Sequence, residues 1–275
     1  MPDHPAIAVA LGAGGARGLA HIAVLEVFDE LGIKPAAIAG TSIGALVGAA
    51  YAAGMSGRAI RGHALDLMRD RATLMAALIS ARTGRLSELL SGLGSPFLVD
   101  AEKFLERVWP DGLPDSFAAL KLPFTAVATD YYGRVEAAFT QGPLLPAVAA
   151  SIAIPSLVRP VRHDGRVLVD GGAVNPLPFD HLIGRADLIV AVDVTGGPSP
   201  HATRAPTPFE VMFGTLQIMQ AAIVTAKLKI YRPEIVVRPA VERFRILDFF
   251  EGSAILTAAA PVKDELKREL ERHLS

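Results

Sequence analysis

A glycine-flanked segment, Gly-Thr-Ser-Ile-Gly at residues 40–44, most constrains what this chain can fold into. A short apolar run at 36–39 precedes it, and a small-residue pattern typical of a buried helix begins at Ala45. A sharp turn from a strand into a helix crowds the backbone, so it favours residues without a Cβ, such as Gly40 and Gly44. The start of the helix also directs N–H groups and a positive dipole end at developing negative charge. Ser42 is therefore the candidate nucleophile.

A second glycine-rich loop, Gly-Ala-Gly-Gly-Ala-Arg-Gly at residues 12–18, follows the apolar run 6–11 and precedes another predicted helix. Consecutive glycines at a helix start expose backbone N–H groups, so the loop is a candidate oxyanion hole facing the Ser42 turn. A dinucleotide-binding loop is the alternative, but Arg17 stands where its last glycine belongs, and the second strand ends in Gly40 instead of an acidic residue. A glycine turn without chemistry also stays open.

Strand and helix signals alternate along the chain and predict an α/β fold. We expect three layers: a mainly parallel central sheet with helices on both faces. Strands are predicted at 6–11, 36–39, 124–129, 135–139, 167–170, 188–194 and 235–238. We expect one domain over residues 1–275, with a helical insertion at about 56–122 that is a candidate cap over the site, and a helical and strand extension at about 205–275.

Composition narrows the function classes. The chain has 275 residues, about half of them apolar, which suffices for a substantial core. Its 27 basic and 28 acidic residues give a net charge of −1 and no basic patch for nucleic acid. There is no cysteine, and the seven histidines lack metal-ligand spacing, so we expect no metal and no cofactor. The first residues lack the basic start of a secretory signal, and we expect a cytoplasmic protein.

A serine nucleophile needs a base. The downstream histidines all occupy polar or terminal positions, which favours a solvated surface role; they are His63, His163, His181, His201 and His273. Three carboxylates follow or end predicted strands: Asp130, Asp170 and Asp193. Position alone does not choose among them, although only Asp170 is followed by two glycines, Gly171 and Gly172. A Ser-His-Asp esterase using His181 or His201 is the alternative mechanism.

Four motifs in order resemble the patatin-like phospholipase family. They are the glycine loop with Arg17, the Ser42 turn, Ala-Ser-Ile-Ala-Ile-Pro at residues 150–155, and Asp170-Gly171-Gly172. The resemblance covers about residues 5–194, which we take as the catalytic core, and the remaining tail is similar to bacterial members related to neuropathy target esterase. Ala13 departs from the pattern, since many members have glycine there.

This resemblance implies a catalytic dyad in which Ser42 attacks an ester carbonyl and Asp170 takes its proton directly. It further implies that the amides of Gly14, Gly15 and Ala16 stabilise the oxyanion, that Gly12, Arg17 and Gly18 support their loop, and that an acyl-enzyme is then hydrolysed by water. An unperturbed aspartate is a weak base, so a desolvated pocket must raise its basicity. The implied substrates are acyl esters of phospholipids, lysophospholipids or other lipids. A noncatalytic lipid-binding or regulatory module with the same fold is a further alternative.

Two apolar segments bear on membranes. Residues 36–55 are uncharged for long enough to cross a bilayer, but their glycine and alanine content favours a buried strand and helix. Residues 208–226 form a predominantly apolar helical pattern without a basic face, which favours a core or dimer helix over a membrane-seated one. Transient contact with a membrane surface remains an expectation, and the oligomeric state is open.

Overall fold

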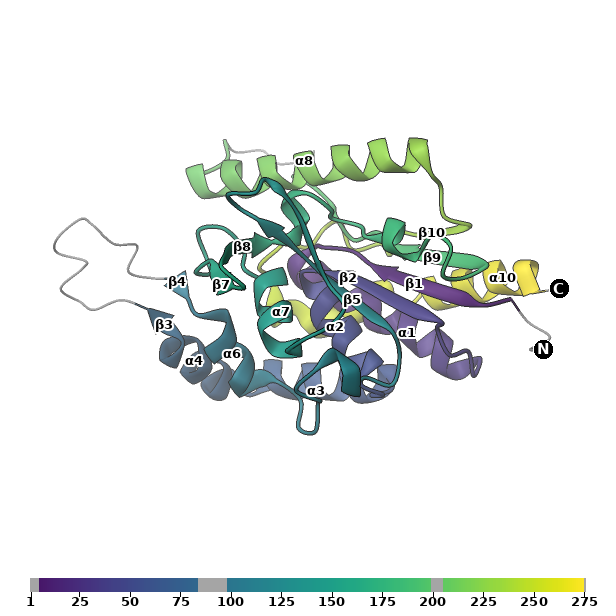
Figure 1. Cartoon of the computed structure of the whole chain (residues 1–275), viewed down its shortest axis with the longest axis horizontal. Coiled ribbons are helices and arrows are strands. Elements are labelled where there is room, and N and C mark those ends of the chain that lie inside the picture. The colour runs from purple at the N-terminus through teal and green to yellow at the C-terminus, as the bar shows by residue number, and fades with distance from the viewer. Residues whose placement is uncertain (1–4, 84–97, 199–204, 275) are drawn as a thin grey trace.

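An eight-stranded sheet crosses the protein and has helices on both sides (Figure 1). The structure is a computed structural model that describes residues 5–83, 98–198 and 205–274. The strand order is β10-β9-β1-β2-β5-β8-β7, and β6 pairs with β5. The strands are β1 (Ile7–Leu11), β2 (Ala37–Thr41), β5 (Phe124–Asp130), β6 (Val135–Phe139), β7 (Val161–His163), β8 (Arg166–Asp170), β9 (Leu188–Val192) and β10 (Ile235–Val237), while β3 (Arg82–Thr83) and β4 (Leu98–Val99) form a separate pair.

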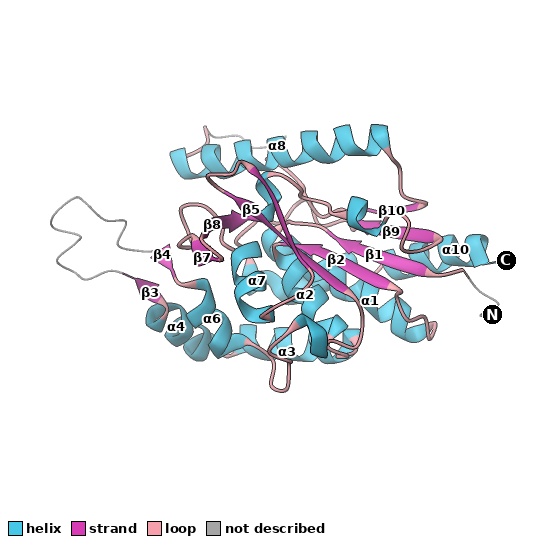
Figure 2. Cartoon of the chain, in the orientation of Figure 1, coloured by secondary structure: helices cyan, strands magenta, loops and turns pink. Residues whose placement is uncertain are grey.

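The helices pack in two layers around this sheet (Figure 2). The α-helices are α1 (His21–Glu30), α2 (Ile43–Ala52), α3 (Gly57–Arg69), α4 (Arg71–Ser80), α6 (Ala101–Val108), α7 (Leu144–Ser151), α8 (Pro208–Ile230), α9 (Gly252–Ala259) and α10 (Val262–Leu274). Short 3-10 helices are η1 (Gly15–Ala20), η2 (Phe117–Ala119), η3 (Gly171–Ala173), η4 (Phe179–Leu182) and η5 (Phe249–Glu251).

Strand β1 shows how the sequence divides the core between these layers. Successive side chains of a strand point to opposite faces of the sheet. Ile7, Val9 and Leu11 belong to the large cluster that includes α1 and α2. Ala8 and Ala10 belong to a smaller cluster with η4 and Val224 of α8. The larger β1 side chains therefore meet the α1 and α2 layer, and the alanines let η4 and α8 approach the other face.

The strand directions bring two distant chain segments together. Strand β2 runs parallel to β5, with Thr41 opposite Val127. Strand β8 runs antiparallel to β5, with Asp170 opposite Ala128, the next residue along β5. Strand β6 occupies one edge of β5, and β2 and β8 both pair with its other edge. The carboxyl ends of β2 and β8 consequently meet at one point on the edge of β5.

The α/β fold with helices on both faces is confirmed, and each of the seven predicted strands is present with shifts of at most two residues at its ends. The parallel part comprises β10, β9, β1, β2 and β5, whereas β6, β7 and β8 are antiparallel to their neighbours. Residues 36–55 form β2 and α2 and are largely buried, as expected. Part of the predicted insertion, residues 84–97, lies outside the described residues, and the single-domain organisation stays a prediction.

Helix α8 differs most from expectation. Its start has a capping box, because the Thr207 side chain accepts a hydrogen bond from the Glu210 amide while Glu210 reaches back to the Thr207 amide. Among the described residues, α8 is the one helix long and apolar enough to cross a membrane, and only 28% of its most apolar stretch is buried. It lies along the outside of the molecule (Figure 1). The segment is therefore not a core helix, while the alternative of a dimer helix stays a prediction.

Candidate active site

The turn at Ser42 has the strained backbone that its sequence predicts. Ser42 joins β2 to α2 with φ 57° and ψ −125°, a conformation that costs a non-glycine residue about 1–3 kcal/mol. Its carbonyl accepts the amides of Ala45 and Leu46, which starts the helix. A Cβ on Gly44 would lie 2.1 Å from the Leu11 carbonyl oxygen, so only glycine fits there. The Ser42 turn and the end of β1 are thus in direct contact, as the sequence suggested.

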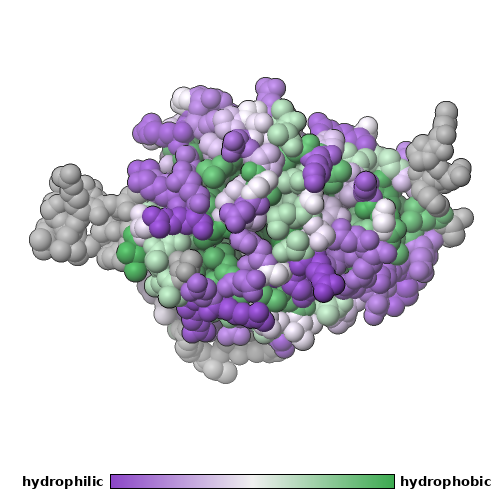
Figure 3. Space-filling view, turned by 90° about the horizontal axis from the view of Figure 1, so that it is seen from below, coloured by the Kyte–Doolittle hydropathy of each residue, from purple (hydrophilic) through white to green (hydrophobic). Residues whose placement is uncertain are grey.

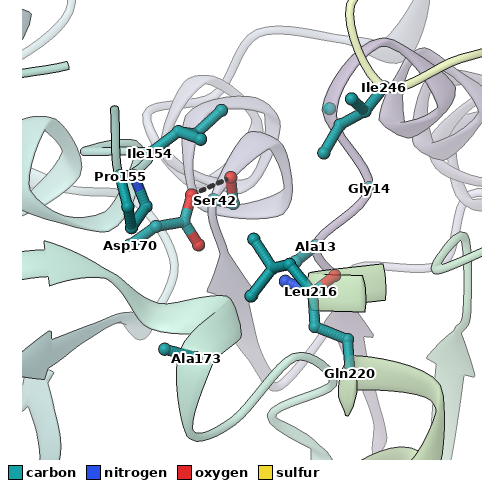
Figure 4. A pocket seen from close by; sticks show the side chains of 11 residues that line it. Ala13, Gly14, Ser42, Ile154, Pro155, Asp170, Ala173, Leu216, Gln220 and Ile246 are labelled. Atoms are coloured by element: carbon teal, nitrogen blue, oxygen red, sulfur yellow. Dashed lines mark hydrogen bonds between the residues drawn. The ribbon is translucent and has the colours of Figure 1, made fainter. Parts of the chain in front are cut away.

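Ser42 and Asp170 form a hydrogen-bonded pair (Figure 4). The Ser42 hydroxyl donates to Asp170 Oδ2 over 2.6 Å, and both residues are buried, at 4% and 6% exposed. Asp170 Oδ1 accepts the Gly172 amide over 2.7 Å. The two carboxylate oxygens are therefore separately engaged: one is anchored to the backbone, and the other faces the serine hydroxyl.

Burial changes the acid–base behaviour of Asp170. Removal from water disfavours the charged form and raises the pKa of this carboxyl to about 6. The hydrogen bonds from Ser42 and from the Gly172 amide favour the charged form and limit this rise. A carboxylate with a pKa near 6 is a better proton acceptor than an ordinary aspartate and is still ionised at neutral pH.

The other candidate acids and bases are engaged elsewhere. Asp130 accepts the Gly133 amide in a turn, and Asp193 accepts from Thr195 and Arg238. His181 Nε2 contacts Glu136 Oε1. His201 lies outside the described residues. Asp170 is thus the predicted carboxylate that the structure brings to Ser42.

The glycine loop presents two free amides and not the three expected. Gly15 has φ 58°, which glycine adopts without strain. The Ala16 amide donates to the Ile246 carbonyl over 2.8 Å, which corrects the expectation that it serves an oxyanion. The Gly12 amide is also used, by the Val192 carbonyl. Within the described part of the chain, no backbone carbonyl accepts the amides of Gly14 or Gly15, and both residues line the pocket beside Ser42.

The supporting glycines of the three motifs are buried, namely Gly12, Gly18, Gly40, Gly44, Gly171 and Gly172. Arg17 is buried as well, at 1% exposed, and its Nη1 makes a long contact of 3.5 Å with the Phe244 carbonyl. Desolvation lowers the pKa of Arg17 to about 10. This position fits a brace inside the loop and not a side chain that receives a lipid head group. His21 is fully buried too, and its Nε2 lies 2.8 Å from the Gly12 carbonyl oxygen, a contact that fixes the start of the glycine loop.

The pocket around Ser42 is small, with a free volume of about 20 Å³, roughly the room of one water molecule. Helix α8 contributes Leu216 and Gln220 to its wall, and Gln220 reaches toward the site (Figure 4). No described residue of 56–122 lines it, but residues 84–97 lie outside the described residues, so the role of the insertion as a cap stays a prediction. Gln220 has no role in the sequence analysis, because its segment shows a predominantly apolar helical pattern.

Ser151, the last residue of α7, and Ala153, just beyond it, brace the Ser42–Asp170 pair. Ser151 Oγ accepts the Ser42 amide over 2.9 Å and donates to the Val127 carbonyl over 2.5 Å. The Ala153 carbonyl accepts the Asp170 amide over 2.9 Å. One short segment therefore holds the backbone of both partners. Sequence analysis identified this segment as a motif but assigned Ser151 no role, since the contact joins residues 109 positions apart.

Comparison with known proteins identifies the family of this chain. Residues 9–183 match the patatin-like phospholipase family. The chain belongs to this family. The match includes the patatin-like glycine loop, the Ser42 turn, the Ser151 segment and Asp170.

Relatives of this patatin-like chain differ in length. An uncharacterized NTE family protein of Mycobacterium tuberculosis is 39% identical over 193 residues, which cover 70% of this chain and 50% of that protein. A lysophospholipase of Aspergillus fumigatus is 32% identical over 197 residues, covering 69% of this chain and 12% of that protein. The chain thus spans half or less of the length of these relatives. The crystal structure of VipD from Legionella pneumophila has a TM-score of 0.52 at 12% identity, covers 99% of this chain and 67% of VipD, and shares the fold.

A second polar cluster lies outside the pair in this patatin-like fold. Glu136, Asp180 and His181 place one possible ligand atom each within 4.8 Å of one another. The Lys227 ammonium already donates to Asp180 Oδ1 over 2.6 Å and also contacts Asn175 Oδ1. Contact with Glu136 raises the pKa of His181. The cluster has its own cation, and it ties α8 to the loop that follows Asp170.

Proposed function

We propose that the chain is a serine lipid acyl hydrolase, a carboxylic ester hydrolase that works through a Ser42–Asp170 dyad. The observation that carries this proposal is the 2.6 Å hydrogen bond between the Ser42 hydroxyl and Asp170 Oδ2 in a water-poor pocket. Family membership and the lysophospholipase name of one relative support a lipid substrate. We take acyl esters of phospholipids or lysophospholipids as the substrate class.

The chemistry follows from the contacts of the pair. Ser42 Oγ attacks the ester carbonyl carbon while its proton passes to Asp170 Oδ2, and the carbonyl oxygen becomes an oxyanion. The amides of Gly14 and Gly15 stabilise that charge. Collapse of the intermediate breaks the ester bond, and the departing alkoxide takes the proton from Asp170. Water then attacks the acyl-serine and gives a proton to Asp170. Asp170 passes this proton to the departing Ser42 oxygen, which releases the fatty acid and restores the Ser42 hydroxyl.

Asp170 is also suited to act without a histidine. Its raised pKa brings the carboxylate closer in basicity to the oxygen it must deprotonate. The engagement of His181 with Glu136 argues against the alternative Ser-His-Asp mechanism through His181. We place the protein in the cytoplasm with peripheral membrane contact; the absence of cysteine fits a reducing compartment.

The test is release of fatty acid from lysophosphatidylcholine, measured by mass spectrometry with the full chain and the Ser42→Ala variant. The proposal expects release by the full chain and background release by the variant. His181→Ala serves as the matched control and keeps the activity. Release that persists in Ser42→Ala contradicts the proposal, and so does a folded wild-type chain inert toward both lysophospholipids and chromogenic acyl esters, which favours the noncatalytic module.

A further inference from the structure

Helix α8 buries Phe213 and Val224 and yet keeps large apolar side chains on its outer side. A surface helix of a globular protein normally turns its apolar side chains to the core and its polar ones to water. In α8 the buried side includes Gln217 and Gln220, at 6% and 5% exposed. The neighbouring Ile218 and Met219 are 57% and 55% exposed. The outer side of this helix therefore exposes apolar side chains that the described residues leave uncovered.

The outer side of α8 is long and almost uncharged. Its exposed large apolar side chains are Phe209, Val211, Met212, Ile218 and Met219, which we call the α8 face. Between residues 209 and 226 the sequence has one charged residue, Glu210, and that residue belongs to the capping box. The side of the molecule opposite α8 is mixed, with hydrophilic residues over much of it and hydrophobic patches between them (Figure 3).

The α8 face is continuous with the wall of the active-site pocket. Leu216 and Gln220 line that pocket (Figure 4). Along the helix they alternate with the exposed Met212 and Met219. Ser156, next to the pocket-lining Pro155, contacts Met212 through its hydroxyl at 3.7 Å from Sδ. A substrate that reaches Ser42 from this side must pass α8, and the present free volume of about 20 Å³ leaves no room for an acyl chain.

We propose that the α8 face docks on the surface of a zwitterionic phospholipid bilayer and so places the Ser42 pocket against its substrate. This inference rests on the proposed lipid hydrolase function. A bilayer fits better than a second copy of the chain, because a protein partner seated on α8 would cover the side from which lipid reaches Leu216 and Gln220. A zwitterionic surface fits better than an anionic one, because residues 209–226 carry no lysine or arginine and the Lys227 ammonium is held by Asp180.

The test is sedimentation of the full chain with vesicles of diether phosphatidylcholine, which has no ester to hydrolyse. The variant replaces both Ile218 and Met219 by serine. The matched control is Ile79→Ser on α4, since Ile79 is also 57% exposed. We expect the double variant to lose about tenfold or more of its vesicle partitioning, because two inserted apolar side chains are removed, and the control to bind as the wild type does.

Two further measurements keep the result interpretable. Thermal unfolding of both variants should match the wild type, since the replaced side chains are exposed. Hydrolysis of a short water-soluble ester should also be unchanged, because neither Ile218 nor Met219 lines the pocket.

Vesicle binding that is absent in the wild type or equal in the double variant overturns the docking. So does a wild-type dimer, seen by light scattering, that the double variant dissociates while its vesicle binding persists. Loss of ester hydrolysis in a wild type that still binds vesicles counts against the proposed function and leaves the docking standing.

Discussion

Asp170 accepts the Ser42 hydroxyl at 2.6 Å although the two residues end or follow strands that run in opposite directions. Strand β2 reaches Val127 of β5 from one end, and β8 reaches Ala128 from the other. The proposed nucleophile and its proposed base thus meet where the two strands end, without a long loop to position either. The arrangement depends on the antiparallel direction of β8.

The first prediction concerns pH. Because Asp170 accepts a proton only when it is ionised, and burial raises its pKa to about 6, activity should rise with pH up to that point. We expect kcat/KM for a soluble acyl ester to fall about tenfold per pH unit below pH 6 and to level off above it. A profile recorded from pH 4.5 to 8.5 checks this. An inflection near pH 7 that disappears in His181→Ala would instead indicate a histidine base.

The second prediction is that the buried, ionised Asp170 side chain, which activity requires, lowers the stability of the folded protein. Folding raises its pKa, so the native state holds the proton more tightly, and this contribution to stability is lost as pH rises through about 6. A shift of about two units corresponds to on the order of 3 kcal/mol above that pH. Asp170→Asn should therefore be inactive yet more stable than the wild type at pH 8. Denaturant unfolding should show this gain shrinking toward pH 4, and a variant less stable at pH 8 would contradict the account.

The third prediction concerns Ser151 as a positioning residue. Ser151→Ala leaves the Ser42 amide and the Val127 carbonyl without their partner, which should cost about 1–3 kcal/mol of stability. We expect kcat to fall at least tenfold with KM little changed, because the strained Ser42 backbone loses its support. Thr125→Val is the control, since Thr125 is also buried and its hydroxyl has no partner. Equal effects of the two substitutions on kcat would show that Ser151 has no specific role.

The fourth prediction sets two adjacent glycines apart. A Cβ on Gly171 would lie 2.2 Å from the Val127 carbonyl oxygen, which is fixed in β5. A Cβ on Gly172 would lie 2.4 Å from Gln220 Nε2, the end of a flexible side chain. Gly171→Ala should therefore lower the melting temperature strongly and abolish activity. Gly172→Ala should fold normally and keep reduced activity, because its Cβ would also lie 3.0 Å from Asp170 Oδ1. Similar melting temperatures for the two variants would contradict this geometry.

Much of the fold could be predicted from local sequence. Apolar runs bounded by turn residues marked β1, β2, β5, β6, β8, β9 and β10, because each buried strand has a continuous apolar signal. Strand β7 was missed, since its three residues, Val161–His163, include two polar ones. The direction of β8 was also beyond the sequence, because strand pairing is set by partners far along the chain.

The site residues also divide into those that local sequence predicts and those that depend on tertiary contacts. Ser42 and the glycine loop stand in local motifs, so their position is readable from a few neighbours. Asp170 could be ranked above Asp130 and Asp193 only by family resemblance, because all three lie at strand ends. The use of the Ala16 amide by Ile246, the brace from Ser151 and the outward apolar face of α8 each depend on tertiary contacts. The pattern of apolar residues shows that a helix is apolar, but it does not show which side of the helix packs against the rest of the protein.

The central claim is that Asp170 removes the proton from Ser42 as this hydroxyl attacks. The most direct test is the rate of labelling by a fluorophosphonate probe, with the modified residue mapped by peptide mass spectrometry, in the wild type, Asp170→Asn and His181→Ala. The account predicts a label on Ser42 that forms about 10²–10⁴ times more slowly in Asp170→Asn and at an unchanged rate in His181→Ala. A label on another residue, or wild-type labelling of Ser42 in Asp170→Asn, would contradict it.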